Sequence, residues 1–85
     1  MFADRRDSLL AESGDYRLAA AEGAVTERQI RAELGELLLG TATGRASADE
    51  ITIFESLGLA IEDLAAASRV YQLATETGAG TWTAF

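Results

Sequence analysis

Apolar residues recur at helical spacing in two stretches of the chain. The first opens with Thr26–Gln29, where a threonine and a glutamine three residues later form the pattern of a capping box. The apolar positions that follow share one face of a helix: Ile30, Leu34, Leu37 and Leu38. We therefore predict an amphipathic helix that ends at Gly40, because glycine is favoured just beyond a helix C-terminus.

The second stretch runs from Leu59 to about Glu76 and carries apolar residues on two faces. A helix of this kind packs on more than one side, and Ala65–Ala67 would let a neighbouring backbone come close. Gly78 is expected to end it. The sizeable apolar surfaces on which it could fold back are those of Ile30, Leu34 and Leu37.

Strand signals are short. Ile51–Phe54 is β-branched and aromatic, which predicts a short buried strand. Ser47–Glu50 also matches a capping box and would start a helix near Ala48, but the β-branched run favours the strand. Phe2–Ala3 is typical of the end of a strand, and the alternation in Thr81–Phe85 is typical of a terminal strand.

Two short helices are expected near the N-terminus. The first is predicted over Arg5–Ser13. Asp4 precedes this segment and a second carboxylate, Asp7, follows three residues later, so we predict that Asp4 is the N-cap of this helix. Gly14 is expected just beyond its C-terminus. Asp15–Glu22 is then a further short helical segment, which ends before Gly23.

Composition narrows the chemistry. Seven arginines oppose 14 carboxylates among 85 residues, and the net charge of −7 argues against nucleic-acid binding. Cysteine and histidine do not occur, which excludes a disulfide scaffold, a Cys/His zinc site, a cysteine nucleophile and a histidine general base. No apolar run approaches the roughly 18 residues that span a bilayer. We expect a single cytoplasmic domain at most, with no bound metal and no membrane contact.

Three pairs of close carboxylates and one glycine pattern are candidate sites. The carboxylate pairs are Glu33 with Glu36, Asp49 with Glu50, and Glu62 with Asp63. A solvated face or a cap is favoured over an acid/base pair by roughly ten to one, since nothing nearby indicates burial. The segment Gly35–Thr41 has the outline of a phosphate-binding loop, but the chain has no lysine and the segment lies within a predicted helix.

Ser56 lies between the predicted strand and the long helix. No histidine or lysine is present to activate it, so a nucleophilic role is disfavoured. From local sequence, a simple helix cap is favoured by about three to one. The alternative is a ligand contact, because ligands of α/β proteins bind at the carboxyl ends of strands and near helix N-termini.

Several motifs together resemble the ornithine cyclodeaminase/mu-crystallin family. They are Ala32–Leu37, Gly44-Arg45 with Ser47, Asp49–Thr52, Phe54-x-Ser56-x-Gly58, Glu62–Ala67 and Val70-Tyr71. The likeness extends over essentially the whole chain and corresponds to about the last quarter of a family member. The resemblance implies an α/β fold, the C-terminal part of a Rossmann-like NAD(P)-binding domain. It would be mostly helical, with one short central strand and a long C-terminal helix.

Further expectations follow from the resemblance. Residues 1–57 would be the rear part of the NAD(P) domain, and residues 58–85 a long helix and tail that return to the dimerisation and substrate domain. Ser56 would lie beside the nicotinamide, and Leu57 would face the substrate. The family's reactions are NAD(P)-dependent: deaminating cyclisation of ornithine, or dehydrogenation and reduction of amino acids and imines.

Other family features have no counterpart in this sequence. The glycine-rich turn, the acidic residue for the ribose, the catalytic aspartate and the substrate-binding basic residues belong to upstream segments, so no catalytic residue is assigned. Glu55 stands where ornithine-specific members tend to carry a basic residue, which argues against ornithine as substrate. We expect a piece that is inactive and binds no NAD(P) alone, with the rest of a split enzyme or a homologous subunit as partner. The alternative is a non-catalytic helical module that self-associates through its apolar helix faces or docks on a full-length homologue.

Overall fold

Three two-residue strands form a small parallel sheet in the computed structural model, which describes residues 1–84. The strands are β1 (Phe2–Ala3), β2 (Ala32–Glu33) and β3 (Phe54–Glu55), in the order β2-β1-β3. The expected strand at Phe2–Ala3 is therefore confirmed, and it is the central one. The strand expected at Ile51–Phe54 starts three residues later than predicted, overlaps the prediction only at Phe54, and is an edge strand instead of the central one.

Two short helices follow β1 and meet at a single serine. They are α1 (Arg6–Glu12) and α2 (Gly14–Ala21). Ser13 ends the first helix and begins the second, because its hydroxyl accepts a hydrogen bond from the Tyr16 N–H at 3.2 Å. Gly14 lies just beyond the C-terminus of α1, after the C-cap Ser13, as predicted, and it is also the first residue of α2.

The amphipathic helix predicted after Thr26 is broken into three elements. They are a 3₁₀ turn, η1 (Glu27–Gln29), then β2, then α3 (Leu34–Leu39). The Gln29 side chain accepts the Thr26 N–H at 2.7 Å, as a capping box requires, but only one turn follows. Pairing of Ala32 with Phe2 outweighs the helical pattern. Gly40 ends α3 in the left-handed region, with φ of 75°, as predicted.

The buried core is small and surrounds the central strand. Its members combine residues of β1 and β2 with side chains from the helices and the turn between them: Phe2, Ala3, Leu9, Tyr16, Ile30 and Ala32. Partly buried apolar residues pack against this core, and Leu57 is one of them. The turn that follows β3 therefore contacts the core through Leu57.

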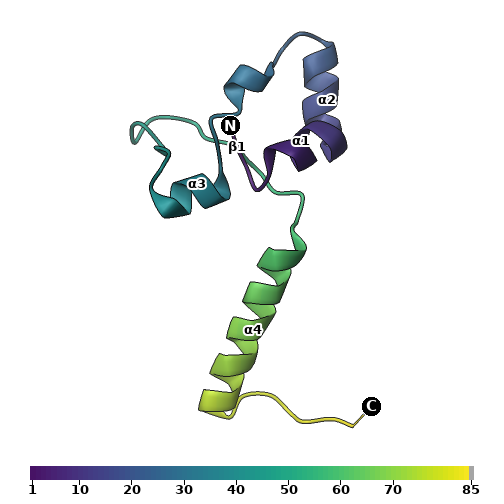
Figure 1. Cartoon of the computed structure of the whole chain (residues 1–85), viewed down its shortest axis with the longest axis vertical. Helices are drawn as coiled ribbons and strands as arrows, with labels where there is room; N and C mark the ends of the chain where they lie inside the picture. The colour runs from purple at the N-terminus through teal and green to yellow at the C-terminus, as the bar shows by residue number, and fades with distance from the viewer. Residues whose placement is uncertain (85) are drawn as a thin grey trace.

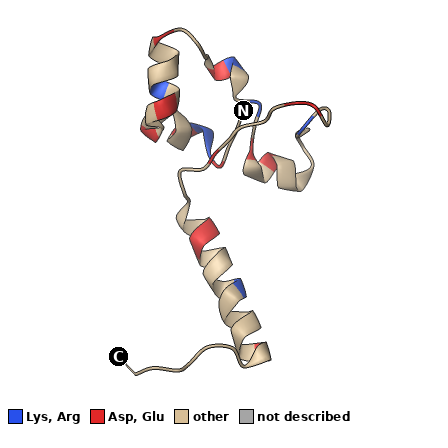
Figure 2. Cartoon of the chain, turned by 180° about the vertical axis from the view of Figure 1, so that it is seen from behind, with Lys and Arg blue, Asp and Glu red and all other residues tan. Residues whose placement is uncertain are grey.

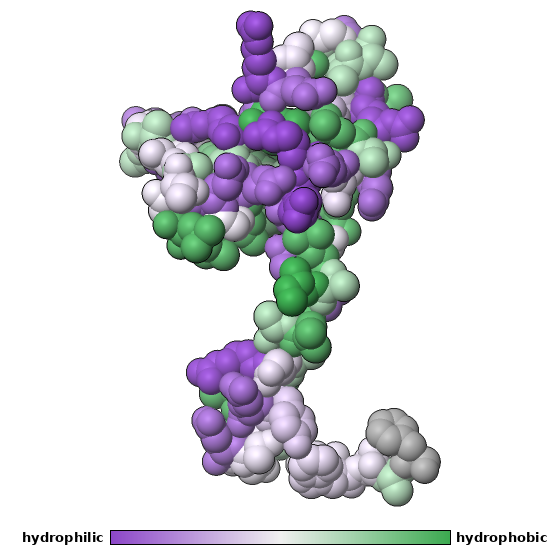
Figure 3. All heavy atoms as spheres, in the orientation of Figure 1, coloured by the Kyte–Doolittle hydropathy of each residue, from purple (hydrophilic) through white to green (hydrophobic). Residues whose placement is uncertain are grey.

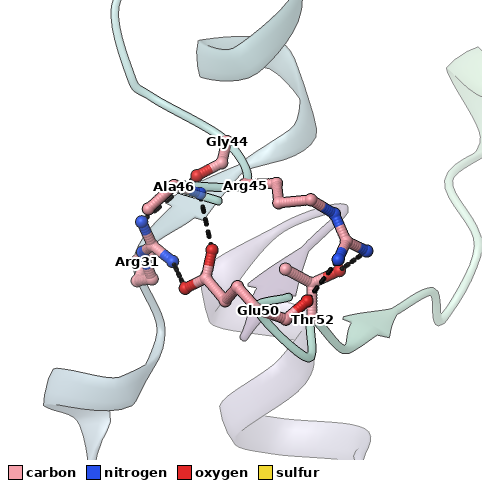
Figure 4. A network of polar contacts seen from close by, with 6 residues as sticks. All are labelled: Arg31, Gly44, Arg45, Ala46, Glu50 and Thr52. Carbon is pink, nitrogen blue, oxygen red and sulfur yellow. Dashed lines mark hydrogen bonds and ion pairs between the residues drawn. The ribbon is translucent and has the colours of Figure 1, made fainter. Parts of the chain in front are cut away.

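A polar network holds the long loop between α3 and β3 (Figure 4). The Glu50 carboxylate accepts hydrogen bonds from the Arg31 side chain and from the Ala46 N–H. The Arg45 guanidinium donates to the Glu50 carbonyl and to the Thr52 hydroxyl. The prediction of a buried strand at Ile51–Phe54 was wrong, because Ile51, Ile53 and Phe54 are 92%, 52% and 49% exposed and residues 51–53 belong to the loop.

The long helix α4 (Ala60–Thr77) extends away from the rest of the chain (Figure 1). It matches the predicted range and ends at Gly78, with φ of 70°. The radius of gyration is 17.4 Å, well above the roughly 12 Å of a compact domain of this length. Within residues 1–84, no other helix or strand packs extensively against α4. A return onto Ile30, Leu34 and Leu37, which the sequence left open, is therefore not observed.

The chain after α4 is irregular. Residues 81–84 form no strand, contrary to prediction, and Phe85 lies outside the described residues. Among the helices of residues 1–84, none is long and apolar enough to cross a membrane. The predicted fold class is confirmed: an α/β chain with a short parallel sheet and a long C-terminal helix.

Candidate functional site

The candidate site lies where the strands end. Because all three strands are parallel, their carboxyl ends meet at one edge of the sheet. Asp4 follows β1, α3 starts directly after β2, and Ser56 follows β3. This edge is where ligands of parallel α/β proteins bind.

The Asp4 carboxylate organises this edge. Its Oδ2 accepts hydrogen bonds from the Leu57 and Gly58 N–H groups, each at 2.7 Å, and lies 3.4 Å from the Ser56 hydroxyl oxygen. Its Oδ1 accepts the Arg5 N–H at 2.8 Å. The side chain is buried, since the residue is only 2% exposed. Asp4 therefore joins the end of β1 to the turn after β3.

The prediction that Asp4 caps the first helix was wrong. The N-cap of α1 is Arg5, whose side chain makes no capping bond. Asp4 uses its carboxylate for residues more than fifty positions later in the chain instead. Nothing in the local sequence distinguishes the two roles, because aspartate before a helix is the ordinary signature of a cap.

Two opposing effects set the ionisation of Asp4. Burial raises its pKa, because it disfavours the charged carboxylate. The hydrogen bonds from Arg5, Gly58, Leu57 and the Ser56 hydroxyl favour that charge, and together they hold the pKa below its ordinary value. The carboxylate is therefore charged at neutral pH and bonds as an anion, which makes these hydrogen bonds stronger than neutral ones.

Ser56 and Leu57, the two residues implicated by resemblance, lie together in this turn. Ser56 is exposed, and it is not the cap of α4, because the N-cap is Leu59 and makes no side-chain bond. The simpler interpretation of Ser56 as a helix cap was therefore wrong. Leu57 is partly buried, and its side chain packs against the core.

Gly58 allows the turn to close. Its φ is 87°, a conformation that residues with a Cβ rarely adopt. No atom lies within 4 Å of where a Cβ would be, so the backbone angle and not crowding favours glycine here. The left-handed residue contributes its N–H to the bond with Asp4 Oδ2.

Further carboxylates surround this edge. Glu33 Oε1 accepts the Arg6 N–H at 2.8 Å and lies 3.6 Å from Arg5 Nε. Glu55 Oε2 lies 3.4 Å from the Ser13 hydroxyl, which donates to it. Across residues 1–84, no group of three or more acidic side chains is arranged to hold a metal ion.

The sequence-adjacent carboxylates behave as caps and loop contacts. The Glu36 side chain accepts the Glu33 N–H at 2.8 Å, at the start of α3. The hydrogen bond from Ala46, together with the positive charges of Arg31 and Arg45, outweighs burial and lowers the pKa of Glu50. These contacts agree with the cap or solvated-surface interpretation.

Comparisons with known proteins cover nearly the whole chain. The sequence profile of the ornithine cyclodeaminase/mu-crystallin family matches residues 2–78. A Δ(1)-pyrroline-2-carboxylate reductase of Bacillus cereus (strain ZK / E33L) is 39% identical over 77 residues, which are 91% of this chain and 24% of that protein. The ketimine reductase mu-crystallin of Mus musculus is 42% identical over 71 residues, 84% of this chain and 20% of that protein.

A solved structure shares the fold. The Δ(1)-pyrroline-2-carboxylate reductase of Thermococcus litoralis, in complex with NADH and L-proline, matches with a TM-score of 0.77 and 43% identity. The match covers 96% of this chain and 25% of that one, so the chain spans about a quarter of the length of these relatives. These matches confirm the resemblance found in the sequence: the chain belongs to the ornithine cyclodeaminase/mu-crystallin family.

Proposed function

We propose that this chain supplies the nicotinamide-side corner of an NAD(P)-dependent oxidoreductase that acts on an imine or amino acid. Residues 1–57 would form the rear of the NAD(P) domain, and residues 58–85 would return to the dimerisation and substrate domain. The observation that carries the proposal is the Ser56–Gly58 turn, which lies at the carboxyl edge of the parallel sheet. In this role Ser56 contacts the cofactor and Leu57 faces the substrate.

Reduction of a C=N bond is the reaction class that fits best. The Bacillus cereus and Thermococcus litoralis relatives are named as pyrroline-2-carboxylate reductases, and the mouse relative as a ketimine reductase. In such a reduction the dihydronicotinamide gives a hydride to the imine carbon, and the nitrogen takes up a proton.

The described residues fit one end of the cofactor and not the other. The exposed Ser56 hydroxyl can face the nicotinamide end. A diphosphate needs free backbone N–H groups, but those of Leu57 and Gly58 are already bonded to Asp4. The carboxylates of Asp4 and Glu33 add negative charge at the same edge. We infer that the 85 residues alone neither bind NAD(P)H productively nor catalyse the reaction.

Two measurements test this proposal. The purified chain is expected to show no saturable change of NADH fluorescence, and turnover by the chain alone would refute the claim of inactivity. In the second, this chain replaces the matching quarter of the Thermococcus litoralis reductase. The chimera is expected to reduce Δ(1)-pyrroline-2-carboxylate with NADH, and the Ser56→Val chimera is expected to have lower kcat/KM. A folded but inactive chimera, or an unaffected variant, would contradict the assigned role.

One observation favours a second function, a helical interaction module. Large apolar side chains along α4 are exposed: Ile61, Leu64, Val70, Tyr71 and Leu73. Figure 3 shows apolar surface along the upper, N-terminal part of the helix, whereas polar and intermediate residues dominate its lower part in the same view. Four of the 18 residues of this helix are charged: Glu62, Asp63, Arg69 and Glu76 (Figure 2). Exposed apolar surface on this scale is typical of association. Light scattering over a range of concentrations tests this function, and a monomer at the highest concentration would count against it.

A further inference from the structure

We infer that Asp4 is the positioning residue of the Ser56–Gly58 turn, which fixes the side chains proposed to face cofactor and substrate. The inference rests on the proposed function for its consequence in catalysis, but its structural content stands on the geometry of this chain. Asp4 lies outside the family motifs quoted from the sequence, and the roles proposed for Ser56 and Leu57 do not involve it.

Several hydrogen-bond donors of the turn converge on one oxygen atom of Asp4. Asp4 Oδ2 accepts two consecutive backbone N–H groups, those of Leu57 and Gly58, each at 2.7 Å. Two such bonds fix the direction of both peptide units, so the backbone on either side of Leu57 cannot rotate without breaking one. The Ser56 hydroxyl lies 3.4 Å from the same oxygen. One carboxylate thus constrains all three residues of the turn.

Asp4 is itself fixed in place by its surroundings. It is buried, and its own N–H donates to the Glu55 carbonyl at 3.3 Å, which continues the pairing of β1 with β3. Its Oδ1 accepts the Arg5 N–H. The anchor therefore stands on the central strand of the sheet, and the turn is held from the most fixed part of the fold.

Apart from its bonds to Asp4, the Ser56–Gly58 turn has few contacts that would fix its conformation. Gly58 has a left-handed backbone, and α4 begins only two residues later without a side-chain cap. The helix beyond it has no extensive packing on the described residues 1–84. Core contact of the Leu57 side chain is the remaining tie. Loss of the carboxylate would consequently free the turn without dissolving the sheet.

Amide hydrogen exchange on the 85-residue chain tests the inference directly. Asp4→Asn keeps the shape of the side chain and removes its charge. Asp7→Asn is the matched control, because Asp7 is highly exposed on the neighbouring helix. A bond to a charged group corresponds to roughly 10- to 100-fold in the opening equilibrium. Leu57 and Gly58 are expected to lose that much protection in Asp4→Asn and none in Asp7→Asn.

The Arg31 amide, which donates to the Met1 carbonyl in the sheet, provides an internal reference. It is expected to stay protected in Asp4→Asn. Equal loss of protection at Arg31, Leu57 and Gly58 would show a general role in stability and overturn the inference. Free exchange of Leu57 and Gly58 in the original chain would overturn it as well, because no bond to Asp4 would then exist.

The pH dependence of amide protection at Leu57 and Gly58 is a second test of the role of the Asp4 carboxylate. Protection of Leu57 and Gly58 is expected to fall as Asp4 becomes protonated, and the profile is expected to be absent in Asp4→Asn. The charged groups around this edge are Arg5 and Arg6 from α1, Glu33 from β2 and Glu55 from β3. Persistence of the profile in Asp4→Asn would show that a group other than Asp4 causes it and would contradict the inference.

The reductase chimera separates this inference from the proposed function. If the chimera is active, Asp4→Asn is expected to lower kcat/KM by roughly 10- to 100-fold, the usual effect of misplaced site residues, and Asp7→Asn is not. Unchanged kcat/KM in Asp4→Asn would overturn the positioning role. An inactive chimera refutes the proposed function, and the exchange result on the chain alone still decides whether Asp4 holds the turn.

Discussion

Leu9 and Leu64 offer a direct test of how unevenly stability is distributed along this chain. Both are leucines in helices, α1 and α4, and both can be replaced by alanine. Leu9 is 0% exposed and belongs to the core, whereas Leu64 is 65% exposed. The same chemical change therefore removes buried surface at one position and mainly solvated surface at the other.

The expected magnitudes differ severalfold. Leucine to alanine in a packed core costs about 2–5 kcal/mol of unfolding free energy, because transfer and cavity effects add. Full burial of a leucine contributes roughly 1.5–3 kcal/mol, and Leu64 has about a third of its surface removed from water, so its loss costs about 1 kcal/mol or less. Alanine also favours the helix by a few tenths of a kcal/mol, which lowers the cost further. Since small domains have about 5–15 kcal/mol in total, Leu9→Ala is expected to remove a large share.

Urea titration followed by the amide signals of Tyr16 and Ile30 measures this difference. Both residues belong to the same core as Leu9, so they report unfolding of that core and not of α4. Equal shifts of the midpoint for Leu9→Ala and Leu64→Ala would refute the reasoning. A large cost for Leu64→Ala that grows with protein concentration would show that α4 is buried against a second molecule.

Three further outcomes follow from the described contacts. The folded-state pKa of Asp4 lies below its unfolded value, so its contribution is present above about pH 4 and is lost as pH falls through the folded pKa. Urea midpoints between pH 6 and 3 are expected to fall less in Asp4→Asn than in the original chain. Gly58→Ala is expected to destabilise by about 1–2 kcal/mol, because φ is 87°, whereas Gly35→Ala within α3 is expected to stabilise by up to about 1 kcal/mol. Thermal melts with the same sign for both would contradict this. Arg31 and Glu50 form an ion pair on a partly solvated surface, so a double-mutant cycle is expected to give a favourable coupling that is smaller at 1 M than at 0.1 M salt. A coupling independent of salt would be the contrary result.

Local signals predicted the parts of this fold that depend on local structure. The C-terminal ends of α3 and α4 were found from Gly40 and Gly78, because a left-handed residue after a helix favours glycine whatever the surroundings. The extent of α4 was also predicted closely, since its pattern is long and uninterrupted. The family was identified from motifs between Ala32 and Tyr71, and its sequence profile matches residues 2–78.

The sheet could not be predicted in the same way. Ala32–Glu33 fits a helical pattern with the leucines after it, yet it pairs with Phe2–Ala3, a distant segment. The ladder of β3 forms at Phe54–Glu55 because the register is set by β1, not by the β-branched residues before it. Strand pairing between distant segments leaves little trace in either sequence segment alone.

The candidate site was predicted in part. Ser56 and Leu57 were singled out through the family motif, and both lie in the turn at the carboxyl edge of the sheet. Their roles toward cofactor and substrate remain predictions. Asp4 was missed because its hydrogen-bond partners are distant in sequence, and aspartate before a helix resembles an ordinary cap.

The strand order has a consequence for how the chain matures during translation. β1 is the middle strand, but it is made before both of its neighbours. At about 5–20 residues per second, the roughly fifty residues between β1 and β3 take on the order of 3–10 seconds to synthesise. Over that interval Phe2 and Ala3 leave the ribosome with one neighbour or none. Until the last strand is made, at least one edge of this apolar segment is unpaired, and such edges make a nascent chain prone to aggregation.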